Sequence, residues 1–229
     1  MSTGKWIAPF VLASGLIAAS TAHARPEGAG FYFGGSGGQS SFDQDREDLD
    51  LVVFESFGGA GLPVFNVRGD LDDSDNNFTG FAGYRFNRYV AVEGGYTDLG
   101  EITYNASISA LNGLSIVPGT MQFTASSKGA FVNGMGIWPI TKIWEVYGRG
   151  GFYVSDTQVS ATARIGSNTS TATESSTSVD AMIGLGTALH LGQHLLVRLE
   201  YQRFGAVGDE DTTGETDVDA FNLGLVIRF

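Results

Sequence analysis

Residues 221–229 alternate strictly between two kinds of side chain. Every second position, starting at 221, is Phe, Leu or Ile, whereas the positions between them hold Asn, Gly, Val and Arg. Because successive side chains of a strand point to opposite faces, this pattern predicts a strand with one apolar face. A helix would repeat its apolar residues every three or four positions, and no stretch of the chain follows that spacing better than it follows alternation.

The same alternation recurs along the chain and predicts an all-β fold. In residues 195–201, Leu, Val, Leu and Tyr share one face, while Arg198 and Glu200 share the other. The 33 glycines weaken helices, and the 16 Phe and 8 Tyr residues favour strands and membrane interfaces. Gly occupies both faces near 129–136 and 148–151, where we expect a bulge or an irregular register. Eight strands are expected, at about 29–42, 77–87, 89–104, 119–138, 143–160, 178–191, 194–207 and 217–229.

The connections between these segments form two classes that alternate along the chain. Tight turns follow every second strand, and long polar connections follow the others. A membrane barrel has short periplasmic turns and long extracellular loops, whereas a soluble sandwich has no reason for this order. The sequence therefore predicts an eight-stranded antiparallel up-and-down transmembrane β-barrel. The tight turns are at Asn87-Arg88, 139–142 and Gly192-Gln193, and the long connections are at 43–76, 105–118, 161–177 and 208–216.

Aromatic residues flank two of the tight turns. Trp138 and Trp144 lie on either side of one turn, and Tyr89 lies at another. Such positions are typical of the aromatic girdle at a membrane interface. In the first long connection, 51–54 and 63–67 flank Gly58-Gly59-Ala60-Gly61. This segment predicts either a hairpin beyond the membrane or two further strands of a ten-stranded barrel.

The first residues have the pattern of a secretory signal. Lys5 precedes an apolar run over 6–19, and Ala22-His23-Ala24 forms a cleavage site of small residues. We therefore expect a signal peptide over 1–24, a barrel domain over 25–229 and export to the bacterial outer membrane. The chain has no Cys and a formal net charge of -12, so a disulfide framework is excluded and nucleic-acid binding is disfavoured.

Several short motifs, in order and spacing, resemble the transmembrane domain of outer membrane protein A and its eight-stranded relatives. The resemblance is densest from Gly80 to Tyr96 and spans nearly the whole predicted mature chain. It implies a monomeric, lumen-filled barrel whose terminal Phe229 is a signal for the outer-membrane assembly machinery. The chain ends at the eighth predicted strand, so we expect the family's periplasmic peptidoglycan-binding domain to be missing. Further matching segments are Leu99-Gly100, Trp138-Pro139-Ile140, Val146-Tyr147-Gly148-Arg149-Gly150-Gly151, Arg198-Leu199-Glu200-Tyr201-Gln202, Leu223-Gly224-Leu225 and Arg228-Phe229.

Five charged residues are predicted to point into the lumen. Eight strands enclose a space that side chains can just fill, so these charges must pair with one another or with trapped water. The resemblance implies a lumen Lys at Met135 and a second lumen Glu at Ala188, so the family's gating salt bridges do not carry over in full. The charges predict either a closed polar core, which we favour, or a narrow gated pore. They are Arg85, Glu93, Arg149, Arg198 and Glu200.

The long connections carry acidic and hydroxyl side chains. Clustered carboxylates can bind Ca²⁺, and the run 70–76 weakly resembles a calcium loop, although no glutamate follows at the right distance. We favour a solvated acidic loop. Residues 167–178 are almost all Ser and Thr, which predicts a mobile low-complexity loop. The acidic residues of the first connection are Asp43, Asp45, Glu47, Asp48, Asp50, Asp70, Asp72, Asp73 and Asp75.

Histidine positions disfavour catalysis. His23 leaves with the predicted signal, and His190 and His194 flank a periplasmic turn, far from the outer rim where barrel enzymes place a histidine base. We therefore predict no enzyme activity, no cofactor and no metal. The expected function is a structural outer-membrane protein that supports the envelope and displays loops, with a narrow channel or a surface adhesin as alternatives. Expected partners are outer-membrane lipids, lipopolysaccharide and the assembly machinery.

Overall fold

The computed structural model describes residues 28–43, 64–112, 115–209 and 214–229. The predicted signal peptide over 1–24 and the segment 51–54 lie outside the described residues. Among the described residues, no helix is long and apolar enough to cross a membrane. The strands are β1 (Gly30–Phe42), β2 (Val64–Asp72), β3 (Ser74–Arg85), β4 (Val90–Asn112), β5 (Ser115–Pro139), β6 (Trp144–Ile165), β7 (Asn168–His190), β8 (Leu195–Asp209) and β9 (Gly214–Arg228).

Eight of the strands close into an antiparallel ring. The order around the ring is β1-β3-β4-β5-β6-β7-β8-β9, and β9 pairs with β1 from Tyr32↔Arg228 to Phe42↔Val218. The remaining strand, β2, pairs with the distal part of β4, beyond the stretch of β4 that pairs with β3. The prediction of an eight-stranded barrel is therefore confirmed, and the ten-stranded alternative is wrong, because the β4–β5 pairing closes the ring without β2.

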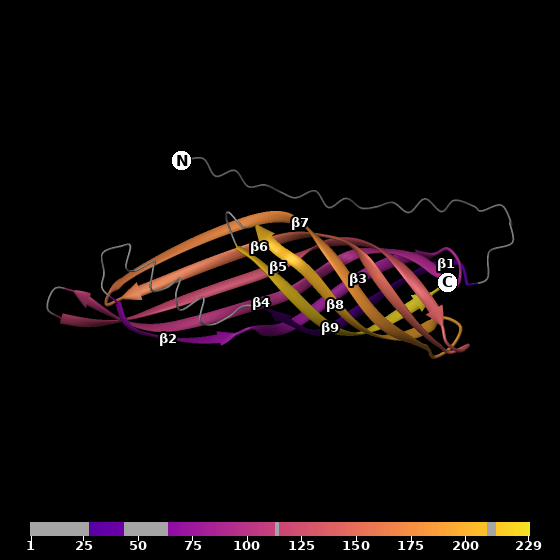
Figure 1. The fold of residues 1–229 in the computed structure, drawn as a ribbon, viewed down its shortest axis with the longest axis horizontal. Coiled ribbons are helices and arrows are strands. Elements are labelled where there is room, and N and C mark those ends of the chain that lie inside the picture. Colours follow the sequence, from indigo (N-terminus) through magenta and orange to yellow (C-terminus); the bar gives the residue numbers. More distant parts are fainter. Residues whose placement is uncertain (1–27, 44–63, 113–114, 210–213) are drawn as a thin grey trace.

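Four strands continue well past the ring, which corrects the predicted loops. β4 to β7 are 22 to 25 residues long, so most of 105–118 and 161–177 is strand rather than loop (Figure 1). Most of the hydroxyl-rich segment predicted to be a mobile loop belongs to β7. Thr is well suited to strands, and the Ser160 and Thr162 hydroxyls lie 3.2 Å from those of Thr173 and Thr171 on the paired strand. We call the part of β4–β7 beyond the ring the extension, and the opposite end, with the tight turns, the turn end.

The register is regular where we expected irregularity. β5 pairs with β6 without a shift from Gly119↔Ile165 to Pro139↔Glu145, so the bulge predicted near 129–136 and 148–151 is wrong. Each glycine on either face leaves its own position in the sheet without a side chain, but the hydrogen-bonded pairing of the two strands stays regular. Register shifts occur in β4 between Asp98 and Glu101, and in β8 between Phe204 and Val207. Gly100 and Ala206 adopt the left-handed conformation at these two shifts, with φ of 84° and 54°.

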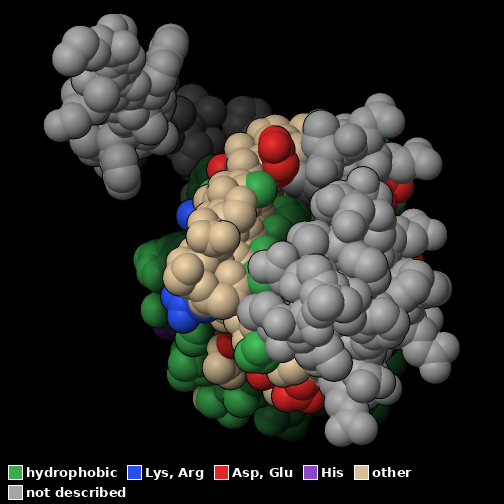
Figure 2. Space-filling view, turned by 90° about the vertical axis from the view of Figure 1, so that its left-hand side faces the viewer, with side chains coloured by type: hydrophobic (Ala, Val, Ile, Leu, Met, Phe, Trp, Pro, Cys, Tyr) green, Lys and Arg blue, Asp and Glu red, His purple; other side chains and the backbone are tan. Residues whose placement is uncertain are grey.

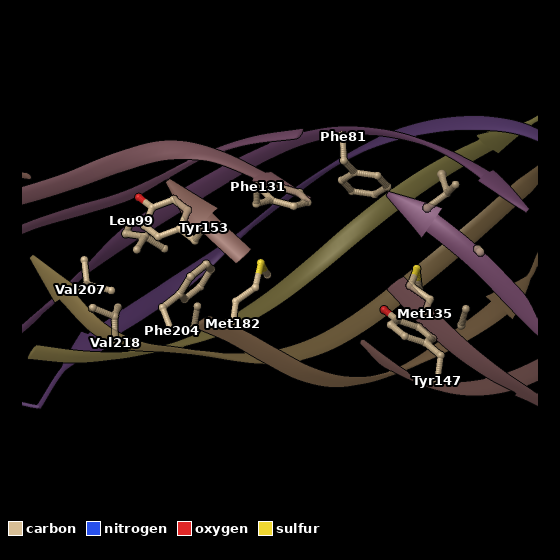
Figure 3. Packing of buried hydrophobic residues seen from close by; sticks show 14 of the residues in the cluster. Phe81, Leu99, Phe131, Met135, Tyr147, Tyr153, Met182, Phe204, Val207 and Val218 are labelled. Carbon is tan, nitrogen blue, oxygen red and sulfur yellow. The ribbon is translucent and has the colours of Figure 1, made fainter. Parts of the chain in front are cut away.

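The two faces of the ring differ in chemistry. Outward positions are apolar and exposed, as shown by Leu185 at 68% and Leu223 at 60%. Towards the extension, the interior contains an apolar cluster: the Tyr153 and Phe204 rings meet edge to face at 5.0 Å, with Leu99, Val207 and Val218 close by (Figure 3). Ser127 and Asp180 are buried beside this cluster. Nearer the turn end, charged side chains share the interior with apolar ones such as Met135, Ile137 and Leu196.

Candidate functional site

The five predicted lumen charges all lie inside the ring. Each is at most 8% exposed. They come from four strands: Arg85 from β3, Glu93 from β4, Arg149 from β6, and Arg198 and Glu200 from β8. Strand alternation explains their placement, because the residues on either side of each charge face outward.

Four of the charges form one central cluster. Arg198 Nη1 donates to Glu93 Oε1 at 2.5 Å, and Arg149 Nη1 donates to Glu200 Oε1 at 2.5 Å. Arg149 Nη1 also lies 3.6 Å from Glu93 Oε2, which joins the two pairs. The Tyr147 hydroxyl donates to the second oxygen of Glu200 at 2.5 Å. Two guanidinium groups thus face two carboxylates, so the cluster is neutral and its charges compensate one another.

Arg85 belongs to a second cluster nearer the turn end. Its guanidinium donates two hydrogen bonds to Glu145, at 3.1 and 3.0 Å, and His190 Nε2 lies 3.3 Å from the same carboxylate. Sequence reasoning missed Glu145 and His190. Glu145 lies four residues before Arg149 on one strand and therefore shares its face, but its position beside a turn obscured this signal.

The two departures from the family pattern also face the interior. Met135 and Ala188 are 3% and 1% exposed. Ala188 is the register partner of both Glu145 and Arg198. Glu145 therefore supplies a carboxylate beside the position where the resemblance implied a glutamate.

Aromatic rings surround the central cluster and close the interior. The Arg198 guanidinium lies 5.2 to 5.3 Å from the ring centres of Tyr32, Phe81 and Tyr147, and that of Arg149 lies 5.1 Å from Phe131. These contacts are within range of cation–π attraction. The packed side chains leave little open space around the charges.

A small cavity, of about 10 Å³, lies between the clustered charges. Arg149, Arg198 and Asn222 line it, and each has a buried polar atom without a protein partner among the described residues. A space of this size accommodates about one water molecule, which needs two to four polar partners. The cavity therefore fits a single bridging water and is too small for a hydrated ion.

The three residues predicted for the aromatic girdle lie outside the ring at its turn end. Tyr89, Trp138 and Trp144 are 47%, 60% and 43% exposed, and Trp144 Nε1 donates to Thr187 Oγ1 at 2.6 Å. The terminal Phe229 is 69% exposed, and its backbone N–H donates to the Phe31 carbonyl at 3.1 Å.

Charged side chains mark the other border of the exposed apolar band. Lys128 is the register partner of both Asp98 and Asp156, and all three point outward. On the next part of the ring, Arg203 lies 3.4 Å from Asp219. We call these residues the charged rim: Asp98, Lys128, Asp156, Arg203 and Asp219. The apolar band thus lies between an aromatic border and a charged border.

The register shift in β8 is tied to this rim by Asp217. The Ala206 N–H donates to Asp217 Oδ1 at 3.0 Å, and Arg203 donates to Asp217 Oδ2 at 2.6 Å. The Ala206 N–H and the Arg203 guanidinium hold the pKa of Asp217 below its usual range. The carboxylate therefore remains charged and holds the shifted strand in place.

The described part of the chain contains two histidines, both at the turn end. His194 Nδ1 lies 3.0 Å from the Arg228 carbonyl, and His190 contacts Glu145, so neither lies near the extension. Among the described residues, no three His, Cys, Asp or Glu side chains form a group that could hold a metal ion. Asp45, Glu47, Asp48 and Asp50 lie outside the described residues.

The family described as "OmpA-like transmembrane domain" matches residues 26–229. Outer membrane protein A of Yersinia pseudotuberculosis is 26% identical over 92% of this chain and 52% of that protein. Outer membrane protein A of Klebsiella pneumoniae is 29% identical over 65% of this chain and 40% of that protein. The chain thus spans about half the length of the curated relatives that it matches, or less.

Two solved structures match most of this chain. Neisserial surface protein A covers 89% of this chain and 100% of its own, with a TM-score of 0.42 and 12% identity. Ail of Yersinia pestis, solved in complex with the heparin analogue sucrose octasulfate, covers 87% of this chain and 99% of its own, with a TM-score of 0.41 and 14% identity.

Proposed function

The chain belongs to the OmpA-like transmembrane domain family, and on that premise we propose that it is an exported, non-catalytic protein that supports the outer membrane and displays a rigid extracellular sheet. In this proposal the turn end faces the periplasm and the extension faces outward. The observation that carries it is the length of β4–β7. β7 starts at Asn168 but pairs with β8 only from Ala181 onward, so a sheet stands beyond the ring.

Partners and biogenesis belong to the same proposal. Outer-membrane lipids and lipopolysaccharide would surround a monomeric barrel, and the assembly machinery would recognise Phe229. A signal peptide over 1–24 would direct export. The exposed apolar band, which would be costly in water, supports contact with lipid.

Surface labelling tests the proposed function. Because the chain contains no Cys, the replacement Ser167→Cys at the β6–β7 tip introduces a single thiol. We expect a membrane-impermeant maleimide to label it on intact cells, whereas a matched Gln193→Cys variant in a periplasmic turn should react only after permeabilisation. The opposite pattern, or labelling of neither before permeabilisation, would contradict the proposed orientation.

A channel through the lumen is the first alternative, and the interior argues against it. The neutral charge cluster leaves a cavity of about 10 Å³, and the packed Tyr153 and Phe204 rings lie beyond it. Side chains that fill the interior of an eight-stranded barrel leave no wide aqueous path. In planar bilayers we expect no steady open-channel conductance from the wild type. A steady conductance that Arg198→Ala abolishes or alters would establish the channel instead.

A surface adhesin is the second alternative. Its binding residues would lie on the same extension, because that part of the described chain stands farthest from the ring. Cell-binding assays after removal of 161–172 distinguish adhesion from a purely structural role.

A further inference from the structure

Two rows on the outward face of the extension contain only uncharged polar side chains, and the charged Arg164 follows in the next row. The rows cross three neighbouring strands: Thr124, Ser160 and Thr173 are register partners, and so are Gln122, Thr162 and Thr171. We call these six residues the hydroxyl–amide face. In the end-on view, a tan band, which consists of backbone and of side chains that are neither hydrophobic nor charged, runs along the described surface (Figure 2).

Both rows lie on the outward side because the register between these strands has no shift. From Phe152 and Val154, which are exposed in the apolar band, the same face of β6 passes Asp156 of the charged rim and reaches Ser160 and Thr162. A single face thus presents apolar, charged and uncharged polar side chains in that order. Ser160 lies four residues past Asp156, which is about 13 Å along the strand.

This order matches the layers of the outer leaflet, if the chain spans the membrane as proposed above. Acyl chains would meet the apolar band, and lipid head groups would lie level with the charged rim. The next layer outward consists of the sugars of neighbouring lipopolysaccharide molecules. The hydroxyl–amide face lies at that level.

The chemistry of the face fits sugars better than it fits a protein surface. Hydroxyl and amide groups each donate and accept hydrogen bonds, as sugar hydroxyls do. The 3.2 Å contacts within the Ser160–Thr173 and Thr162–Thr171 pairs use only part of that capacity. None of the six residues is Trp, Tyr or Arg, the residue types that dominate the binding energy of protein interfaces. We propose that the hydroxyl–amide face docks the oligosaccharide of lipopolysaccharide in the same leaflet.

Cysteine labelling of the protein in native membranes tests this docking. Thr171→Cys reports on the hydroxyl–amide face, and Ser170→Cys reports on the opposite face of the same strand. Both variants would be labelled with an impermeant maleimide in outer-membrane vesicles that carry either full-length or deep-rough lipopolysaccharide. In vesicles with full-length lipopolysaccharide, we expect the maleimide to react with Cys at position 171 roughly fivefold more slowly than in deep-rough vesicles. A change of this size corresponds to about one net hydrogen bond. The rate at position 170 should not change.

A second pair of substitutions distinguishes recognition from crowding. Thr124→Val and Thr162→Val remove two hydroxyls but keep the β-branched shape, so the strands should persist. Added to the Thr171→Cys variant, they should restore rapid labelling in the full-length vesicles. The proposal is overturned if protection survives these changes or if both faces are protected equally. It is also overturned if protection depends on protein density rather than on sugar length, because a second copy of the chain would then be covering the face.

Two further measurements distinguish a failure of the docking proposal from a failure of the proposed function. Faster migration of the unboiled protein in detergent gels reports that the barrel is folded, and its recovery with the vesicles reports insertion. A barrel that is folded and inserted but unprotected at position 171 overturns the docking alone. A chain that does not insert overturns the proposed function.

Discussion

Replacing Glu93 by Gln is expected to lower the free energy of unfolding by about 3–5 kcal/mol, because it leaves buried guanidinium charge without its partner. Glu93 is 1% exposed and contacts both Arg198 and Arg149. Glutamine keeps the shape of the side chain but removes its charge. Arg149 retains Glu200 as a partner, whereas Arg198 has no other carboxylate within ion-pair distance among the described residues.

Urea titration in phospholipid vesicles, followed by Trp fluorescence and gel mobility, measures this effect. Glu101→Gln on the same strand is the matched control: it is exposed and should change stability by less than about 0.5 kcal/mol. Adding Arg198→Met to Glu93→Gln should recover part of the loss, because the unpaired charge is removed. Equal effects of Glu93→Gln and Glu101→Gln would show that the central cluster is not buried as described.

The second large effect is expected on the outer face. Leu185 points away from the ring in the middle of the apolar band and is 68% exposed there. If lipid surrounds this band, Leu185→Arg should cost about 2–4 kcal/mol, because a cation near the bilayer midplane is poorly solvated. In water, the same change at an exposed position would be nearly neutral.

Thr173→Arg is the matched control, on the same strand and the same face but within the hydroxyl–amide face. It should change stability by no more than about 0.5 kcal/mol. The same urea titration measures both variants. A small effect of Leu185→Arg would mean that the apolar band faces water or another protein rather than lipid.

The sequence predicts the ring better than it predicts what stands beyond it. Alternation in 195–201 assigns Arg198 and Glu200 to the inside without knowledge of their partners, because strand geometry alone decides the face. The length of β7 could not be predicted in the same way. Its distal residues are hydroxyl-rich on both faces, so no apolar period marks them, and only cross-strand pairing with β6 shows that they are strand.

The partners of the charges were also beyond sequence reasoning. Arg85 was grouped with the other four lumen charges, but it pairs with Glu145, 60 residues along the chain. Alternation gives a face and not a height along the barrel axis, and the stagger between strands decides which charges meet. The apolar cluster around Tyr153 and Phe204 was missed for a related reason, since period-2 patterning does not separate a polar lumen from a partly apolar one.

Single spin labels along the outward face of β7 test the central claim most directly, namely that this face crosses a bilayer and then rises above it. Cysteine would replace Leu185, Ala181, Thr177 and Thr171 one at a time, in phospholipid vesicles. We predict that oxygen relaxes the labels at 185 and 181 most strongly. Near Thr177, the register partner of Asp156, relaxation by oxygen should decrease and relaxation by an aqueous nickel complex should increase. At position 171, relaxation by the nickel complex should dominate. Strong nickel accessibility at all four positions would contradict the account.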